Sequence, residues 1–385
     1  MSEYRNNPNS QIEYEEYVNE REERRRKRRM VIIRRRIVVG LIGLALICLL
    51  IFGIVKGIKA IANAFSKEPE IEVVQIEEVK ATPEPTPTPK AVQMLAANEP
   101  SISKIHGYDV FEGYNIDTSE ASYIGSEEMM SEYAALIDAT EGKLIAGKEA
   151  TVRINPASMT KIMTLLVAAE HISEEELDNL VEITSDDTYY AYKHDLSTAG
   201  FVVGEKVPVR ELFYGTILPS GADAAIALAR YVAGNEEDFV TLMNEKVAEL
   251  GLSQTTHFTN CVGLFGDDHY STCVDMAMIL KATIENEYCY EVMNLHKYDL
   301  EKRPEHEDIV TLSNWFLRRI EDKETHGEVL CAKTGYVNQA GSCAASFYVS
   351  NEGKPYFCVT AKAHSAWRCI YDQVYIYENL IKHAK

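Results

Sequence analysis

Positive charge is scarce over most of this 385-residue sequence, which holds 39 Lys and Arg against 59 Asp and Glu. The shortage is uneven. Residues 1–36 contain 11 Lys and Arg and 7 Asp and Glu, a net charge of +4, so the remainder carries −24. Binding to nucleic-acid phosphates requires clustered positive charge. The acidic body therefore argues against a nucleic-acid partner.

Cysteine is also sparse, and its number argues against a disulfide framework. One of the eight cysteines, Cys48, lies within an apolar run, so seven remain for the rest of the chain. Seven is an odd number, and a domain of this size does not need disulfides for stability. We expect most of them to be small core residues. Cys331 and Cys343 are the pair that could face each other across a hairpin.

The sequence also lacks a recognisable metal-ligand pattern. His257, Asp267, Asp268 and His269 come nearest to one, but their spacing fits no zinc motif. We therefore predict neither a metal nor a cofactor.

Residues 37–55 form a hydrophobic run without a single charge. About 19 apolar residues are enough to cross a membrane as one helix. The basic segment 1–36 ahead of it predicts a cytoplasmic amino terminus and a single-pass protein whose bulk lies outside. The stretch 62–64 (Ala-Asn-Ala) resembles a signal cleavage site, but Lys56 and Lys59 precede it and favour an uncleaved anchor.

Residues 56–119 are predicted to form an extracytoplasmic linker, and residues 120–385 the globular domain. The linker contains TPEPTPTPK, which favours the extended polyproline II conformation of a semi-rigid spacer. In the globular part we expect a hairpin at 133–146, helices in the middle, then strands and a closing helix. The expected helices cover 158–169, 207–218, 222–233, 238–250 and 370–384, and the late strands 327–335, 341–350 and 355–363. This order predicts an α+β fold with one antiparallel sheet and flanking helices.

Ser158 and Lys161 stand three residues apart in PASMTKIMT, at the start of an apolar helix. This spacing puts both side chains on the same helix face. A serine hydroxyl needs an adjacent base to act as a nucleophile, and Lys161 can serve only if it is uncharged. The alternative is a helix cap beside a snorkelling lysine. The pattern alone is weak, because a second copy, Ser101 to Lys104, lies in the polar linker.

Two further motifs follow in the chain: Ser220-Gly221-Ala222 before a predicted helix, and Lys333-Thr334-Gly335 in a predicted strand. With PASMTKIMT, they resemble the serine D-alanyl-D-alanine carboxypeptidases, which are low-molecular-weight penicillin-binding proteins. The resemblance covers about 130–380 and includes IDATEGKLI and MNEKVAELGLSQTTHFTNCVGL. It implies a β-lactamase/transpeptidase-like fold with a helical subdomain, at a bacterial cell membrane.

The resemblance also implies a reaction. The chain would remove the terminal D-Ala from peptidoglycan stem pentapeptides through an acyl-enzyme on Ser158, with Lys161 as base, and β-lactams would acylate the same serine. Ser220 would relay a proton to the leaving amine, and the charge of Lys333 would help to lower the pKa of Lys161. Backbone N–H groups of Ser158 and Tyr336 would stabilise the oxyanion. The substrate-binding residues would be Lys333, Thr334, Gly335 and Tyr336.

Two positions depart from the family pattern. Ala222 replaces the usual Asn, and Val337 stands where Thr is frequent. A catalytically weak or inactive wall-binding or regulatory homologue is therefore an alternative. A β-lactamase is another, although it would need a carboxylate to activate water and 251–260 contains no acid. Arg318 and Arg319 are expected to make surface ion pairs, with contact to the substrate carboxylate as the alternative.

Overall fold

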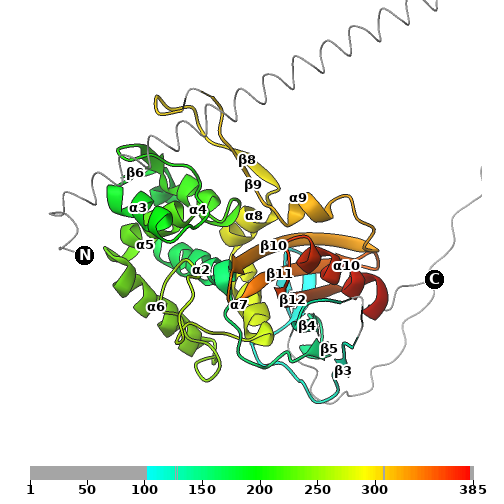
Figure 1. Ribbon diagram of the computed structural model, residues 1–385. Coiled ribbons are helices and arrows are strands. Elements are labelled where there is room, and N and C mark those ends of the chain that lie inside the picture. Colours follow the sequence, from blue (N-terminus) through cyan, green and yellow to red (C-terminus); the bar gives the residue numbers. More distant parts are fainter. Residues whose placement is uncertain (1–101, 126, 128, 307, 382–385) are drawn as a thin grey trace, which may run out of the picture. The chain divides into compact units, whose positions relative to one another are not determined.

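The computed structural model describes residues 102–125, 127, 129–306 and 308–381 (Figure 1). The predicted basic tail, the apolar run 37–55 and most of the linker lie outside these residues, so the membrane anchor stays a prediction. Among the described residues, no helix combines the length and apolar character needed to cross a membrane.

A six-stranded sheet forms the centre of the fold, in the order β10-β11-β12-β4-β5-β3. Five neighbouring strands pair antiparallel, but β3 pairs parallel with β5, so the sheet is mixed and the expected all-antiparallel sheet is wrong at this edge. Because β3 has only two residues, it is too short to produce a periodic sequence pattern. In sheet order the strands are Gly327–Val337, Gly341–Ser350, Pro355–Ala363, Tyr133–Asp138, Lys143–Lys148 and Ser122–Tyr123.

Both faces of the sheet are covered, which explains why its strands are apolar on both sides. In β4, Ala135 and Ile137 belong to the same core cluster as helix α7 (Cys273–Glu285), whereas Ala134 and Leu136 belong to the cluster with α10 (Arg368–Leu380). Successive side chains of a strand point to opposite faces, so this division follows from the sequence order. The α+β architecture predicted from the sequence is confirmed in this respect.

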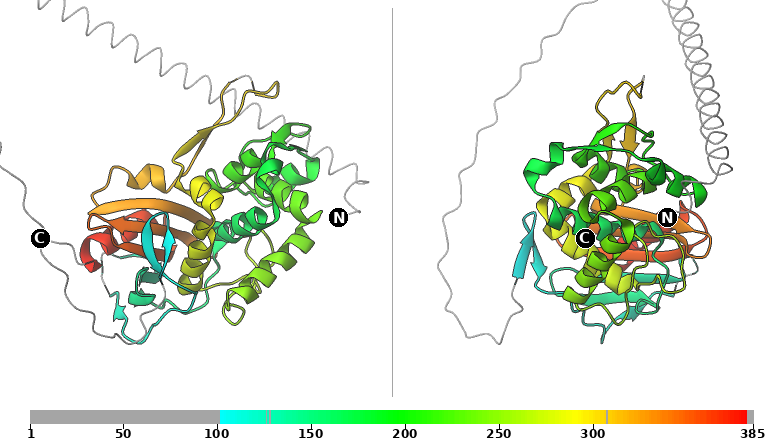
Figure 2. Two further views of the ribbon diagram at one scale, coloured as in Figure 1. Left: turned by 180° about the vertical axis from the view of Figure 1, so that it is seen from behind. Right: turned by 90° about the vertical axis from the view of Figure 1, so that its left-hand side faces the viewer.

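A group of helices lies beside the sheet, on the side of β10 (Figures 1 and 2). Its central member, α2, is buried along most of its length, which accounts for the nearly continuous apolar stretch from Ile162 to Ala168. The helices of this group are α2 (Lys161–His171), α3 (Ser185–Lys193), α4 (Val209–Ile217), α5 (Ala222–Ala233), α6 (Glu236–Glu249) and α8 (Glu287–Asn294).

Short elements connect these parts. The β8–β9 hairpin projects from the rest of the fold (Figure 2), and β1 and β2 lie ahead of residue 120, where the sequence places the start of the domain. The short strands are β1 (Ile102–Ile105), β2 (Tyr108–Phe111), β6 (Leu180–Glu182), β7 (Lys206–Pro208), β8 (Lys297–Asp299) and β9 (Thr311–Ser313). The short helices are η2 (Ala157–Thr160), η3 (Glu174–Asp178) and α9 (Leu317–Ile320).

The seven cysteines of the described part are all free and buried. Cys331 and Cys343 do not face each other, because the register of β10 and β11 places Gly335 opposite Cys343 and Phe347 opposite Cys331. The expectation of small core residues is therefore confirmed for these seven cysteines.

Candidate active site

Ser158 lies in η2, a single turn that leads into α2 and packs against the edge strand β10. The contact is unusually close. A Cβ at Gly335 would lie 2.9 Å from the backbone nitrogen of Ser158 and 2.9 Å from the carbonyl oxygen of Pro156, so only glycine fits there. Ala157, directly before the serine, has a positive φ of 47°. This turn is held in a conformation that a free chain would rarely adopt.

Lys161 contacts Ser158 as its spacing in the sequence suggests. The Lys161 Nζ donates to Ser158 Oγ at 3.1 Å and to the carbonyl oxygen of Val262 at 2.7 Å. The lysine is only 1% exposed, and this burial lowers its pKa to about 8, against the opposing influence of nearby Cys261 and Asp223. Removal from water disfavours the charged amine, which is the condition for lysine to act as a base.

The Val262 carbonyl is a partner that sequence reasoning missed. Asn260 fixes it, because the Asn260 side-chain oxygen accepts hydrogen bonds from the backbone N–H groups of Val262, Gly263 and Leu264. Gly263 has φ of +85°, and a Cβ there would collide with the carbonyl of Ala157. The loop after Asn260 thus presses on the serine turn and directs one carbonyl at Lys161. The motif FTNCVGL contains these residues, but their role depends on a folded turn.

Ser220 and Lys333 form a second pair. The Lys333 Nζ donates to Ser220 Oγ at 2.8 Å and to the carbonyl of Thr334 at 2.7 Å. Ser220 has a positive φ of 63° and does not cap α5, because Gly221 occupies the cap position without a side-chain bond. The bend between α4 and α5 therefore directs the hydroxyl toward β10.

Lys161 influences Lys333 electrostatically. Burial, and then the charge of Lys161, hold the pKa of Lys333 well below its usual range. Two buried amines that repel each other cannot both carry a proton at little cost. The sequence-based expectation was the reverse influence, of Lys333 on the pKa of Lys161. The causes that act on Lys161 are burial, which lowers its pKa, and the nearby Cys261 and Asp223, which oppose this shift.

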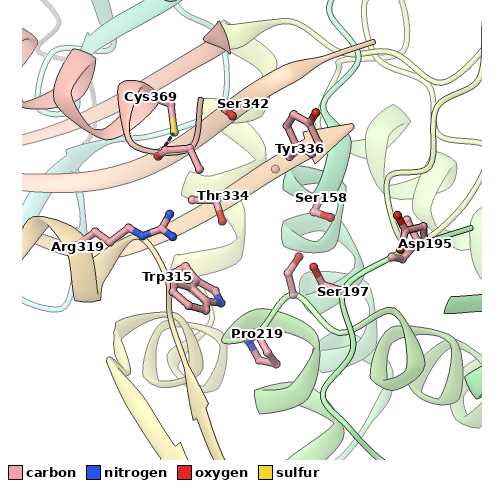
Figure 3. A pocket seen from close by; sticks show the side chains of 14 residues that line it. Ser158, Asp195, Ser197, Pro219, Trp315, Arg319, Thr334, Tyr336, Ser342 and Cys369 are labelled. Carbon is pink, nitrogen blue, oxygen red and sulfur yellow. Dashed lines mark hydrogen bonds between the residues drawn. The ribbon is translucent and has the colours of Figure 1, made fainter. Parts of the chain in front are cut away.

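A cleft of about 290 Å³ is lined by the serine of each pair, Ser158 and Ser220 (Figure 3). Five of the predicted residues line it, while Lys161 and Lys333 lie buried at only 1% and 2% exposure. The five are Ser158, Ser220, Thr334, Gly335 and Tyr336. All seven predicted residues therefore lie at this cleft: five line it, and the two buried lysines are hydrogen-bonded to Ser158 and Ser220. Asp195, Ser197, Trp315, Arg319 and Ser342 also line it, and no sequence motif pointed to them as a group.

The two neighbouring arginines have different environments. Arg318 makes a surface ion pair with Glu321 at 3.0 Å, as expected. Arg319 instead lies in the cleft wall, with its guanidinium carbon 4.7 Å from the ring centre of Trp315 and 4.8 Å from that of Trp367. Two cation–π contacts restrict the orientation of the guanidinium.

Ala222, the departure from the family pattern, is fully buried at the first turn of α5. Its N–H donates to the carbonyl of Ser197 at 2.8 Å. The next residue, Asp223, accepts hydrogen bonds from the N–H groups of Ala199 and Gly200. The loop at 195–200 is therefore attached to the start of α5, immediately after Ser220.

His269 contacts the serine turn η2 through Thr160. Thr259 N–H donates to the Nδ1 of His269 at 3.1 Å, so the proton lies on Nε2, which donates to Thr160 Oγ1 at 2.8 Å. Burial, aided by nearby His257, lowers the pKa of His269 to about 3. The neutral ring therefore has a structural role. Among the residues that the structure describes, no group of three or more His, Cys, Asp or Glu could hold a metal ion.

The buried neutral His269 predicts a loss of stability in acid. The unfolded chain takes up a proton below about pH 6.5, whereas the folded chain does so only near pH 3, so stability falls as the pH drops between these values. The slope attributable to this residue is about 1.4 kcal/mol per pH unit. We expect thermal unfolding of His269→Gln to depend less on pH between 6.5 and 4.5 than that of the wild type. Parallel pH dependences would contradict this account.

Comparison with known proteins adds to the geometry. The family described as D-alanyl-D-alanine carboxypeptidase (peptidase S11) matches residues 118–363. The chain is 32% identical to the D-alanyl-D-alanine carboxypeptidase DacF of Bacillus subtilis over 214 residues, covering 54% of this chain and 52% of that protein. It is 36% identical to DacA of Escherichia coli over 171 residues, covering 43% and 42%. The matches thus span about half the length of these relatives or somewhat less.

Solved structures of a DD-transpeptidase and a penicillin-binding protein have a similar fold. The crystal structure of the Streptomyces K15 DD-transpeptidase superposes with a TM-score of 0.59 at 26% identity, covering 66% of this chain and 98% of that one. Penicillin-binding protein 5 of Haemophilus influenzae superposes with a TM-score of 0.57 at 25% identity, covering 65% and 70%.

Proposed function

The chain belongs to the D-alanyl-D-alanine carboxypeptidase family, and on this basis we propose that it releases the terminal D-Ala from peptidoglycan stem peptides ending in D-Ala-D-Ala. The family resemblance stated from the three motifs is confirmed by the family match over residues 118–363. The observation that carries the proposed activity is the 3.1 Å contact between Lys161 Nζ and Ser158 Oγ. Burial lowers the pKa of this lysine to about 8, which favours its uncharged, basic form.

In the first step, uncharged Lys161 takes the hydroxyl proton of Ser158 while Oγ forms a bond to the scissile carbonyl carbon. Lys161 becomes an ammonium, for which the Val262 carbonyl is a ready acceptor at 2.7 Å. The carbonyl oxygen becomes an oxyanion. Backbone N–H groups of Ser158 and Tyr336 are the proposed donors, each contributing about 3 kcal/mol to the transition state. The close approach of Gly335 to the Ser158 backbone brings the neighbour of Tyr336 beside the serine turn, which supports this assignment.

In the second step, the C–N bond breaks and the proton held by the Lys161 ammonium is passed to the leaving amine of D-Ala, which leaves Lys161 uncharged again. Ser220 is the proposed relay, because its hydroxyl is hydrogen-bonded to Lys333 at 2.8 Å and lines the cleft. The acyl group then remains on Ser158. Water attacks the acyl carbon while Lys161 accepts the water proton. The bond from the acyl carbon to Ser158 Oγ then breaks, and Lys161 returns the proton to Oγ, which releases the shortened peptide and restores the serine.

The edge strand β10 orients the substrate. An extended peptide can add to an exposed sheet edge through main-chain hydrogen bonds, and Thr334 to Tyr336 of β10 line the cleft. Arg319 lies at the Thr334 end (Figure 3) and carries a permanent charge. We therefore assign the terminal carboxylate of the substrate to Arg319, Lys333 and Thr334, which leaves the residues before the scissile bond on the other side of Ser158.

Replacing Arg319 with Gln is expected to raise KM for a D-Ala-D-Ala peptide by about tenfold, with a smaller change in kcat. The reason is the loss of a charged hydrogen bond to the carboxylate, worth roughly 1.5–3 kcal/mol. Steady-state kinetics test this, with Arg318→Gln as the matched control that removes only the ion pair to Glu321. An unchanged KM in Arg319→Gln would show that the carboxylate binds elsewhere.

The activity itself is tested with the full-length chain and a stem pentapeptide, by measuring released D-Ala. Fluorescent penicillin separates the alternatives. A persistent label with D-Ala release supports the carboxypeptidase, rapid turnover of the penicillin indicates a β-lactamase, and absence of both label and release indicates an inactive homologue in which Ala222 is a sign of decay.

A further inference from the structure

Asp195 ends helix α3 at a position that normally favours glycine. Its N–H bonds to the carbonyl of Tyr192 at 3.1 Å, and the N–H of Leu196 bonds to that of Ala191 at 2.9 Å. These two bonds form the Schellman arrangement, in which the residue after the helix adopts left-handed backbone angles. Asp195 does so, with φ of 50°.

This aspartate is unfavourable for the helix on two counts. Glycine adopts the left-handed conformation without steric cost, whereas aspartate does so less readily, although more readily than most residues with a Cβ. A negative charge at the carboxyl end of a helix is also opposed by the helix dipole. The sequence thus breaks two local preferences at one residue, and such places are typical of functional sites.

The loop that follows Asp195 is attached to helix α5 by hydrogen bonds. The carbonyl of Ser197, two residues after Asp195, accepts a hydrogen bond from the N–H of Ala222. Further along the loop, the N–H groups of Ala199 and Gly200 donate to the carboxylate of Asp223. All of these contacts lead to the first turn of α5, next to Ser220. The position of Asp195 is therefore coupled to that of the catalytic residues.

The Asp195 side chain is exposed and lines the cleft. Figure 3 shows it on the opposite side of Ser158 from Arg319. Within the described part of the chain, no hydrogen-bond donor or cation pairs with its carboxylate. The cleft consequently carries a positive charge at one end and a negative charge at the other.

We propose that Asp195 is a specificity-determining residue that selects stem peptides with a side-chain amine on the residue before D-Ala-D-Ala. The inference rests on the proposed function, because the orientation of the substrate follows from it. With the terminal carboxylate at Arg319, the residue before D-Ala-D-Ala lies on the Asp195 side of Ser158, where an ammonium group would meet the unpaired carboxylate. A diamino acid supplies that group.

The test compares two peptides that differ only in this amine: one with lysine before D-Ala-D-Ala, the other with norleucine. For the full-length wild-type chain, we expect kcat/KM to be about three- to fivefold higher for the lysine peptide, the ratio typical of one exposed charge pair. The difference should lie in KM and should shrink with added salt. In Asp195→Asn the ratio falls to about one. Asparagine tolerates the left-handed conformation, so the turn is retained.

Asp195→Gly provides a second variant, because glycine relieves the backbone and should raise the melting temperature while it also removes the preference. Asp186→Asn is the matched control: it removes an exposed acid from the other end of α3, and the lysine preference should persist. Equal rates for both peptides in the wild type, or a preference that survives in Asp195→Asn, would overturn this inference alone. Failure to release D-Ala from either peptide would overturn the proposed function as well.

Discussion

Replacing Ser158 with Ala is expected to abolish both D-Ala release and covalent labelling by fluorescent penicillin. Without the hydroxyl, no acyl-enzyme can form, and no other described hydroxyl lies within hydrogen-bond distance of Lys161. Loss of the nucleophile in serine hydrolases lowers kcat by roughly 10⁴- to 10⁶-fold. The side chain is small and only partly buried, so the variant should fold and its melting temperature should stay close to that of the wild type.

The matched control for this experiment is Ser101→Ala, which alters the serine of the second S-x-x-K sequence. Its lysine, Lys104, forms a surface ion pair with Asp109 at 3.5 Å in the β1–β2 hairpin, apart from the cleft. This variant should retain D-Ala release and labelling. Penicillin labelling of Ser158→Ala at the wild-type rate would show that another residue is the nucleophile.

Replacing Lys161 with Met is expected to slow acylation by penicillin roughly 10³- to 10⁴-fold, the upper range for removal of a general base. Methionine fills a similar volume and needs no polar partner, so the loss should reflect chemistry and not unfolding. Stopped-flow labelling of folded protein measures the rate. Lys161→Arg should not restore it, because the guanidinium keeps its proton.

The wild-type enzyme should show the matching pH dependence. Burial lowers the pKa of Lys161 to about 8, and the reactive form is the uncharged amine. The acylation rate should therefore rise with pH up to about 8 and level off above it. This rise should be absent from the residual rate of Lys161→Met. A Met variant that reacts as fast as the wild type, with the same pH profile, would place the base elsewhere.

Much of the fold could be predicted, because the patterns involved are local. Helix α5 at Ala222–Ala233 and strands β11 and β12 have the bounds that periodicity and turn residues predict. Helix α3 was missed, since its sequence SDDTYYAYK is polar and its stability depends on tertiary contacts such as that between Asp187 and Arg230 at 2.8 Å. The parallel edge strand β3 was missed because two residues carry no period.

The candidate site divides in the same way. Ser158, Lys161, Ser220 and Lys333 were found because each belongs to a short contiguous motif. The Val262 carbonyl could not be found, because every residue has a carbonyl and only the Asn260 turn distinguishes this one. Arg319 was named with Arg318 but not separated from it, because their different environments depend on Trp315 and Trp367, which are 52 residues apart.

The placement of Trp315 and Trp367 has a practical consequence. The sequence contains two tryptophans, and both stack on the Arg319 guanidinium at the wall of the cleft. All indole emission of the protein therefore originates beside Arg319, to which the terminal carboxylate of the substrate is assigned by proposal. Arrival of a carboxylate at Arg319 changes the polarity around both rings at once. If the carboxylate binds there as proposed, the intrinsic fluorescence of the native chain would report occupancy of the cleft, and ligand titrations would need no attached dye.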